Sequence, residues 1–414
     1  MASISFRAPL YLCDVPGKIA AMFRRNLLRH RDAHREERVG PVELFFDLVF
    51  VFAITQLSHV IIEHPDRTGF LQAGILFVAI WWVWVETAWV TNWLDVRTME
   101  VRLLLFFLMA VALVMTISLP DAFGERATIF VTAYLATRFC RHLFMLCALA
   151  RHNRDNFVGF IRITIWAAIE SIFWIAGLLA EETATRMAIW GGAIAILNLA
   201  PTFSYWLPGL GATDTRVWDI EGHHFSERCG LFIIIALGES ILVTGGAFGE
   251  TEWTGPAIAA FASAFLGTVA MWWLYFDVGA ERAARRLAQD QDPGRMARLA
   301  YTYFHIPIVA GIILTAASDE MALHHPLGHA GTAEIFCLIG GPALYLFGNL
   351  IFKRTNAIHF PLSHLVGLGL LAAVLPFARQ MSPLNLSLAA TGSLILVASW
   401  EMISLRETRS SMRD

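Results

Sequence analysis

The chain has 414 residues, of which 57% are hydrophobic and only 16% are charged, and it contains 14 Trp and 30 Phe. These proportions exclude an ordinary soluble globular domain and indicate a membrane protein. The formal net charge of −3 says little about partners, because nearly all charged residues lie in the connections between apolar runs. We therefore expect the lipid bilayer as the main partner, and no nucleic acid.

Apolar runs of about 17 to 25 residues recur from residue 43 onward, and each is long enough to cross a hydrocarbon core as a helix. Because the runs are continuously apolar and do not alternate, helices are expected in place of a β-barrel. We predict an all-α polytopic membrane protein with about twelve transmembrane helices. The predicted spans are 43–62, 70–92, 101–118, 127–150, 158–180, 187–206, 228–248, 255–278, 301–317, 333–352, 361–378 and 384–404.

The basic residues predict the orientation of these spans. If both termini are cytoplasmic, the outer connections contain only Arg67, Arg126, Arg186 and Arg379 of the 31 Lys and Arg. Cytoplasmic connections carry such an excess of positive charge. We therefore expect a multi-pass membrane protein with both ends in the cytoplasm.

Residues 1–40 form a basic N-terminal segment on the cytoplasmic side. Its stretch "KIAAMFRRNLLRHRDAHREER" is either a basic amphipathic helix on the inner leaflet or a solvated charged tail. Residues 207–227 form a cytoplasmic connection in the middle of the chain, and residues 406–414 form a cytoplasmic tail.

An internal duplication relates the two halves of the chain. "ELFFDLVFVFAI" from Glu43 aligns with "ERCGLFIIIALG" from Glu227, and the Trp81-Trp82 pair aligns with Trp272-Trp273. The alignment offset is 184 at Glu43, 191 at the tryptophan pairs, and larger still at the next run, as insertions in connections would produce. We predict two six-helix repeats, 41–206 and 228–405, which share one orientation because six is even, as in parallel transporter repeats.

Four charged side chains are expected near one level in the inner part of the membrane. Asp47 lies about 9 Å beyond Pro41, and Glu86 reaches a similar depth from the outer side. Asp277 ends the eighth span and Arg102 begins the third. We expect a paired network in which Asp47 or Glu86 faces Arg102, with either a structural or a gating role.

The first span carries a polar stripe. Glu43, Asp47 and Ser58 follow helical spacing on an otherwise apolar run. Lipid exposure would leave these groups unsatisfied, so the stripe predicts contact with a cavity or a polar partner helix.

Two acids and one base are expected to share the membrane midplane. Glu239, Glu170 and Arg138 each lie about 17 to 18 Å into their spans. Arg138 is expected to pair with Glu170 or Glu239, which leaves the other acid able to carry a proton. This level is either a substrate, ion or proton site or a buried packing network.

Several small or hydroxylated residues flank this acid in "ALGESILVTGG". Ser240 and Thr244 add oxygens to the candidate ion site. Gly238, Gly245 and Gly246 allow close helix approach or local unwinding.

No catalytic or cofactor motif occurs in a supporting context, so we expect no enzyme activity and no cofactor. The five cysteines lack metal-ligand spacing. His223 and His224 with Glu227, and the stretch "HHPLGH" from His324, are read as solvated loop histidines in preference to a metal site.

Two long motifs carry a resemblance to a known family. "VELFFDLVFVFAITQLS" and "HHFSERCGLFIIIALGESILVTGG" resemble the two signatures of the bacterial low-temperature-requirement A (LtrA) family, and the hydrophobic profile matches from about residue 38 to the C-terminus. The family usually has a histidine where this chain has Cys229, so no role that needs an imidazole is expected there. The resemblance implies a multi-span inner-membrane protein linked by name to growth in the cold, and it supplies no reaction or ligand.

The run "FFDLVFVFAIT" is also similar to the first helix of lysosomal-type potassium channels, which are built from six-span units. This chain has Phe45, Phe46 and Asp47 where that helix has an FSD motif. The likeness implies that the first and seventh spans line a pore and that Asp47 ties helices together.

We therefore expect a secondary transporter or a channel-like permeation protein for an unidentified small solute or ion. The alternatives are a non-transporting sensor or scaffold and a lipid-acting accessory protein involved in cold growth. A homodimer remains an open arrangement.

Overall fold

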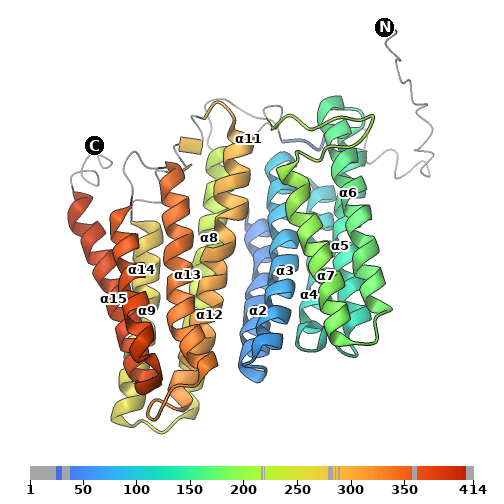
Figure 1. The fold of residues 1–414 in the computed structure, drawn as a ribbon. Coiled ribbons are helices and arrows are strands. Elements are labelled where there is room, and N and C mark those ends of the chain that lie inside the picture. The colour runs from blue at the N-terminus through green and yellow to red at the C-terminus, as the bar shows by residue number, and fades with distance from the viewer. Residues whose placement is uncertain are drawn as a thin grey trace.

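The computed structural model describes residues 25–29, 38–215, 218, 220–277, 283–284, 286–287, 290–356 and 361–406. Within these ranges the chain contains no strand, only two isolated bridges, and twelve long helices (Figure 1). The helices are α2 (Pro41–Glu63), α3 (Arg67–Trp93), α4 (Met99–Ile117), α5 (Ala127–Leu149), α6 (Arg154–Leu178), α7 (Thr183–Thr202), α8 (Gly222–Glu250), α9 (Gly255–Phe276), α12 (His305–His324), α13 (Thr332–Asn356), α14 (Leu362–Val374) and α15 (Pro383–Ser404). The expected all-α polytopic fold is confirmed.

Eleven helical segments of the described chain are long and apolar enough to cross a membrane. The twelfth helix, α7, has 20 residues and packs against α6 and α3. We call the end of the bundle at which α2 begins the inner end, and the opposite one the outer end.

Two predicted helix boundaries are wrong by about two turns. The seventh span begins at Gly222, not residue 228, so His224 and Glu227 lie inside α8 and not in a loop. The ninth span was expected to end at residue 317, but α12 runs on to His324. Polar residues ended the apolar run in both cases, whereas neither stretch contains a residue that stops a helix.

The helix starts follow from local capping. Pro41 occupies the first turn of α2, and the backbone N–H of Gly40 donates to Glu43 Oε2 over 2.9 Å. The Asp66 side chain accepts from Gly69 N at the start of α3 over 2.9 Å. Such caps satisfy backbone donors that the first turn leaves without partners.

The same helix pairs pack in both halves of the chain. In the first half these pairs are α2–α3, α2–α4, α3–α5, α3–α7, α4–α5, α5–α6 and α6–α7. Each has a packed counterpart in the second half: α8–α9, α8–α12, α9–α13, α9–α15, α12–α13, α13–α14 and α14–α15. This recurrence is what two parallel six-helix repeats would produce. The domain limits 41–206 and 228–405 stay a prediction.

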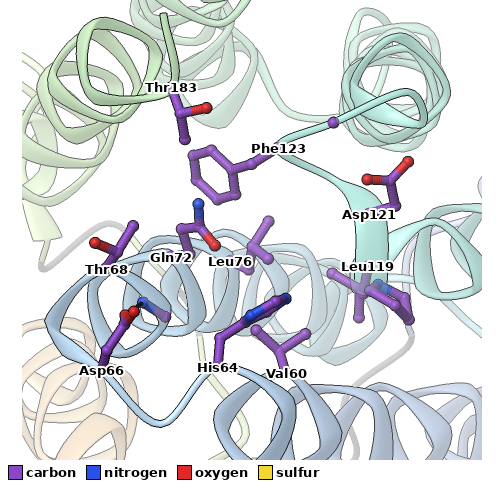
Figure 2. Close-up of a pocket in the computed structure, with 13 residues that line it drawn as sticks. Val60, His64, Asp66, Thr68, Gln72, Leu76, Leu119, Asp121, Phe123 and Thr183 are labelled. Carbon is purple, nitrogen blue, oxygen red and sulfur yellow. Dashed lines mark hydrogen bonds between the residues drawn. The ribbon is translucent and has the colours of Figure 1, made fainter.

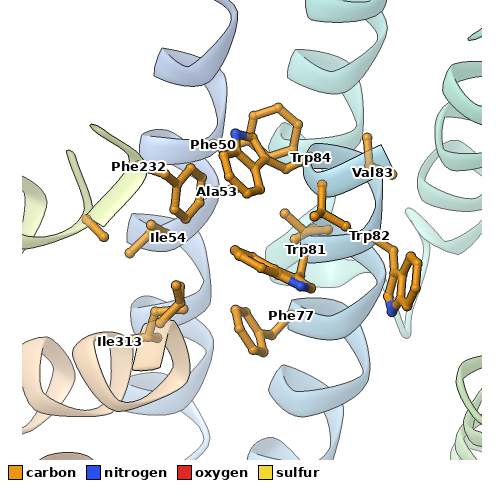
Figure 3. Packing of buried hydrophobic residues seen from close by; sticks show 14 of the residues in the cluster. Phe50, Ala53, Ile54, Phe77, Trp81, Trp82, Val83, Trp84, Phe232 and Ile313 are labelled. Carbon is orange, nitrogen blue, oxygen red and sulfur yellow. The ribbon is translucent and has the colours of Figure 1, made fainter. Parts of the chain in front are cut away.

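The halves meet along α2 and α3 on one side and α8 and α12 on the other, in the middle of the bundle (Figure 1). Buried aromatic side chains fill this interface (Figure 3). Phe232 of α8 packs against Trp81 and Trp84 of α3, with ring centroids 5.7 and 4.2 Å apart. Ile313 of α12 lies beside Ile54 of α2.

A π-helical segment, Ala297–Tyr303, precedes α12 after the short α11 (Pro293–Met296). Pro307 cannot donate a backbone hydrogen bond, and Phe304 N donates to Leu299 O over 3.1 Å. The Thr302 carbonyl instead accepts from Trp81 Nε1 over 2.9 Å. The irregular turn therefore lets an indole of the first half bond to the backbone of the second.

Glycine brings α12 and α13 into close contact. A Cβ on Gly311 would lie 2.5 Å from the Tyr345 nitrogen. In contrast, a Cβ on Gly238, Gly245 or Gly246 would meet nothing within 4 Å, and α8 is continuous through all three. The expectation that these α8 glycines allow close approach or unwinding is therefore wrong.

Most of the basic N-terminal segment and of the C-terminal tail lies outside the described residues. Residues 25–29 are not helical, and Leu28 forms an isolated bridge with Leu94. Arg29 Nη2 donates to Thr91 O over 2.8 Å. An amphipathic helix is thus wrong for these five residues, which lie against the inner end of α3.

Candidate functional site

The inner network joins the two halves near the start of α2 and α8. It consists of Glu43, Asp47, Arg228 and His224, whose side chains are all fully buried. Arg228 Nη2 lies 2.9 Å from Asp47 Oδ1, and Arg228 Nη1 lies 3.2 Å from Glu43 Oε1. His224 Nε2 lies 3.1 Å from Glu43 Oε2. Because the acids belong to the first half and the bases to the second, their attraction holds the halves together.

Helix α3 completes this network. Trp84 Nε1 donates to Asp47 Oδ1 over 2.8 Å, and Arg228 Nη1 donates to Thr91 Oγ1. Buried charges are tolerated only when they are paired and hydrogen-bonded. These contacts give Asp47 the helix-tying role that the potassium-channel likeness implied.

The first-half network lies among α3, α5 and α6. It consists of Glu86, Arg138, Arg141, His142 and Glu170. Arg138 pairs with Glu86 over 2.9 Å and also with Glu170, and Arg141 pairs with Glu86. Two guanidinium groups thus balance two carboxylates in the interior of one half.

Neutral side chains donate further hydrogen bonds to Glu170. Tyr134 Oη and Trp174 Nε1 donate to Glu170 Oε1 over 2.7 and 2.8 Å. Arg138 Nη1 also donates to Tyr134 Oη over 2.8 Å. A ligand could reach Glu170 only by displacing these partners, so this network resembles a packing clamp more than an open binding site.

Glu239 stands apart from both networks. It lies in the middle of α8, has an exposed fraction of 8%, and accepts a hydrogen bond from Thr55 Oγ1 of α2. No ion pair to Glu239 occurs in the part of the chain that the structure describes. This carboxylate therefore has a hydroxyl partner from the opposite half and no cation.

The Thr55–Glu239 contact joins equivalent positions of the two predicted repeats. The residues are 184 apart, which is the alignment offset of Glu43 and Glu227. Equivalent residues of two related copies touch each other only near the axis that relates the copies. Glu239 therefore lies at the predicted repeat axis, in the middle of α8.

Comparison with known proteins identifies the family. The model for "Bacterial low temperature requirement A protein (LtrA)" matches residues 38–399. The chain belongs to the LtrA family. An uncharacterized protein of Rhizobium meliloti (strain 1021) is 41% identical over 376 residues, which cover 89% of this chain and 90% of the relative. No solved structure matches the chain.

In this LtrA chain, one of the two partners predicted as alternatives for Arg138 forms the ion pair. Arg138 pairs with Glu170, as one of the two alternatives required. Glu239 is separate from both, because α8 lies in the other half. Depth along a helix sets the level of a side chain but not the direction in which it points, and direction decided this outcome.

The expected pairing of Arg102 with Asp47 or Glu86 is wrong. Arg102 is exposed, and its Nε donates to Val96 O over 3.2 Å. Asp277 follows the last turn of α9, is half-buried, and belongs to neither network. Arg228 of α8 occupies the role assigned to Arg102.

Several hydroxyl groups of α8 and α2 lie within two turns of the Thr55–Glu239 contact. Thr244 Oγ1 donates to Ser240 O over 2.6 Å, whereas the buried Ser240 Oγ has no hydrogen-bond partner in the described chain. The Ser58 Oγ on α2 is likewise buried without a partner. The polar stripe of α2 thus divides into an inner, paired part at Glu43 and Asp47 and an outer part at Ser58.

The sequence prediction missed four buried charged residues of this LtrA protein: Arg141, Arg228, Asp319 and Glu401. Arg228 was placed at a membrane boundary because the predicted span began there. Arg141 lies one residue before a histidine on α5, and its i, i+3 spacing from Arg138 was an available signal for a shared face. Asp319 was assigned to a loop.

Groups of three or more His, Cys, Asp or Glu able to hold a metal ion do not occur in the described ranges. His224 is a member of the inner network. The histidines from His324 to His329 are exposed at the outer end.

Two hollows lie away from Glu239. A polar cavity of about 250 Å³ opens at the outer end, between the start of α3 and the turn Leu119–Asp121 (Figure 2). Its carboxylates hold local turns, since Asp66 accepts from Gly69 N and Asp121 Oδ2 accepts from Arg126 N over 3.2 Å.

The second hollow, of about 50 Å³, lies beside the first-half network. Its lining combines Glu86 and Arg141 with the indoles of Trp82, Trp89 and Trp93. This volume admits a few water molecules, which explains why Glu86 is the most exposed carboxylate of that network.

Proposed function

We propose that this LtrA protein is a secondary transporter or channel-like permeation protein whose cation or proton path follows the interface between the two halves. We call the surfaces of α2, α8 and α12 that meet around Thr55 and Glu239 the axial path. The observation that carries the proposal is Glu239, a buried carboxylate at the predicted repeat axis with a hydroxyl partner and no cation among the described residues.

A carboxylate at this depth needs a counter-charge. Placing an ionised side chain at the centre of a membrane helix costs about 2.5 to 3.5 kcal/mol on insertion scales. The two networks meet this cost with arginine, whereas Glu239 has no such partner in the described chain. A proton or a bound cation arriving from outside the protein would supply the charge.

The position also fits the architecture of transporters. Proteins built from six-helix repeats bind substrate and coupling ion near the midplane, between the repeats. The inner network lies below Glu239, since Asp47 is about 12 Å inward of Thr55 along α2. Access from the inner side would then require the Arg228 contacts to open as the halves move apart.

The burial of the inner network and of the first-half network favours the alternative function, a sensor or scaffold. Glu43, Asp47 and Glu170 are paired and buried, as a purely architectural role would require. Under this alternative Glu239 is another packing residue, and the purified protein moves no ion.

A flux measurement separates the two functions. Purified protein is reconstituted into liposomes loaded with the pH dye pyranine, and a pulse of acid, NaCl or KCl is applied outside. The proposal expects a protein-dependent change in internal pH or a cation flux coupled to it. Glu239→Gln removes the charge that a cation would pair with, so the rate should fall by up to about 60-fold, the equivalent of roughly 2.5 kcal/mol.

The matched control is Glu250→Gln, the same substitution at the exposed end of the same helix. It should keep the wild-type rate. Wild-type flux that Glu239→Gln leaves unchanged would remove Glu239 from the path. No flux from well-folded wild-type protein would favour the scaffold.

A further inference from the structure

A second buried carboxylate, on α12 of the second half, has no side-chain partner among the described residues. Asp319 lies on α12, has an exposed fraction of 5%, and makes no hydrogen bond or ion pair with any residue that the structure describes. Its Oδ2 atom is fully buried without a donor or acceptor. Burying an ionisable group in this way is costly, so such a group in a membrane helix calls for an explanation.

The neighbours of Asp319 place it on the side of α12 that faces α8 and α9, inside the second half. Leu323, one turn further along α12, packs in one apolar cluster with Ala247 of α8 and Ala260 of α9. Residues four apart lie on the same face of a helix. Asp319 therefore faces α8 near the level of Thr244, one turn inward of the Leu323–Ala247 contact.

Asp319 is closer to the outer end than Glu239 is. It lies about 6 Å inward of Leu323, whereas Glu239 lies about 12 Å inward of Ala247, at roughly 1.5 Å per residue. The level difference between the two carboxylates is thus about 6 Å along the membrane normal.

Unpartnered hydroxyls occupy the same region. The Ser240 Oγ and Ser58 Oγ atoms are buried without partners in the described chain. Thr55 of α2 bonds to α8, and Ile54 lies beside α12 (Figure 3), so Ser58, one turn outward, faces the groove between these two helices. The outer part of the axial path therefore carries polar atoms that the packing does not use.

We propose that Asp319 is the outer proton-carrying carboxyl of this protein, through which a proton passes between the outer face and Glu239 of the axial path. This inference rests on the proposed function. The carboxylate takes up a proton from the outer side to become a neutral acid, and it releases the same proton to the Glu239 carboxylate or to water.

A proton fits the site better than a metal cation does. Na⁺ or Ca²⁺ requires several oxygen ligands around one point, whereas no acidic or amide side chain contacts Asp319 in the described residues. A purely structural acid would use its oxygens in hydrogen bonds, whereas the buried Oδ2 makes none with the described residues.

The charged surroundings do not supply a fixed counter-ion. The other titratable groups toward the outer ends of α12 and of its packed neighbours are Glu320, His324, Glu239, Glu250, His59, Glu63, Glu334, Cys337 and Arg67. None of these described groups forms an ion pair or a hydrogen bond with Asp319.

Carbodiimide labelling tests the carboxyl directly. Dicyclohexylcarbodiimide enters apolar sites, and a protonated carboxyl adds across its C=N bond to give an acylisourea that rearranges to a stable acylurea. The full-length protein in lipid nanodiscs is labelled over a range of pH and analysed by peptide mass spectrometry. We expect labelling of Asp319 that declines as the pH rises, and none of the exposed Asp155.

Protection of Asp319 by NaCl at constant pH would overturn the assignment of a proton. Absence of labelling at every pH would overturn the proton-carrying role. Asp319→Glu keeps a carboxyl and should retain labelling, which distinguishes a lost acid from a misfolded protein.

The liposome measurement then separates this inference from the proposed function. Asp319→Asn, which is nearly isosteric, should slow the acid-driven pH change at least about tenfold, the equivalent of roughly 1.4 kcal/mol. Asp155→Asn should leave it unchanged. If Glu239→Gln abolishes flux but Asp319→Asn does not, the inference on Asp319 fails alone. If wild-type protein gives no flux, the proposed function fails first.

Discussion

Removing Arg228 should destabilise the contact between the two halves. Arg228→Met deletes the guanidinium that lies 2.9 Å from Asp47 and 3.2 Å from Glu43. All three side chains are fully buried, so the substitution leaves two carboxylates in the interior without their arginine. Breaking a buried pair by removing one partner costs about 3 to 5 kcal/mol.

The remaining partners limit the loss. His224 and the Gly40 N–H still contact Glu43, and Trp84 Nε1 still donates to Asp47. We therefore expect the free energy of unfolding to fall by about 3 to 4 kcal/mol, the lower part of that range. The measurement is an SDS titration of purified protein in mixed micelles, followed by tryptophan fluorescence.

Two variants control for this prediction. Arg97→Met breaks the exposed Arg97–Asp95 pair, in which the Arg97 side chain is 66% exposed, and should cost less than about 1 kcal/mol. The triple variant Glu43→Gln, Asp47→Asn, Arg228→Met removes all three charges and should regain most of the lost stability. Equal stability of Arg228→Met and Arg97→Met would refute the assignment of the inner network as a clamp.

Two further predictions concern helix packing and orientation. In the same SDS titration, Gly311→Ala should lower stability by about 1 to 3 kcal/mol, because its Cβ would lie 2.5 Å from the Tyr345 nitrogen. Gly238→Ala, which meets open space, should raise it by about 0.5 to 1 kcal/mol; a loss at both positions would contradict the packing assigned to α8. With the five native cysteines replaced by serine, Glu125→Cys should react with an impermeant maleimide in spheroplasts and Arg151→Cys only after lysis. The reverse pattern would invert the membrane orientation.

The sequence predicts the helices well because hydrophobic length determines them directly. It also predicts that a charge at one depth needs a partner at the same depth, and Arg138 with Glu170 meets that expectation. Depth is a property of one helix alone, so it can be calculated before the packing is known.

The partners of Asp47 could not be predicted in the same way. Arg102 and Arg228 both lie at the inner ends of predicted spans, and the choice between them depends on which helices are neighbours. Arg228 becomes accessible to Asp47 because α8 begins at Gly222, and its first turns are buried against α2 and α3. The sequence prediction placed Asp319 in a loop for a related reason, since a polar stretch inside a helix resembles a loop when only hydropathy is considered.

The pairing of the buried carboxylates changes from the inner end of the bundle toward the outer end. At the inner end, Glu43 and Asp47 bond to Arg228, which is not their repeat equivalent, so a contact between the two halves closes this end. Further out, the predicted equivalent positions Thr55 and Glu239 meet with no base among the described residues, and Asp319 of α12 has neither a base nor a donor there. A protein that needed only rigidity would gain most by pairing the deepest charge, because that charge is the most expensive to bury. Arg228 lies instead at the inner end, where its contacts close the interface between the halves. This is the distribution expected for the proposed gated path, in which a mobile proton or cation supplies the counter-charge of Glu239.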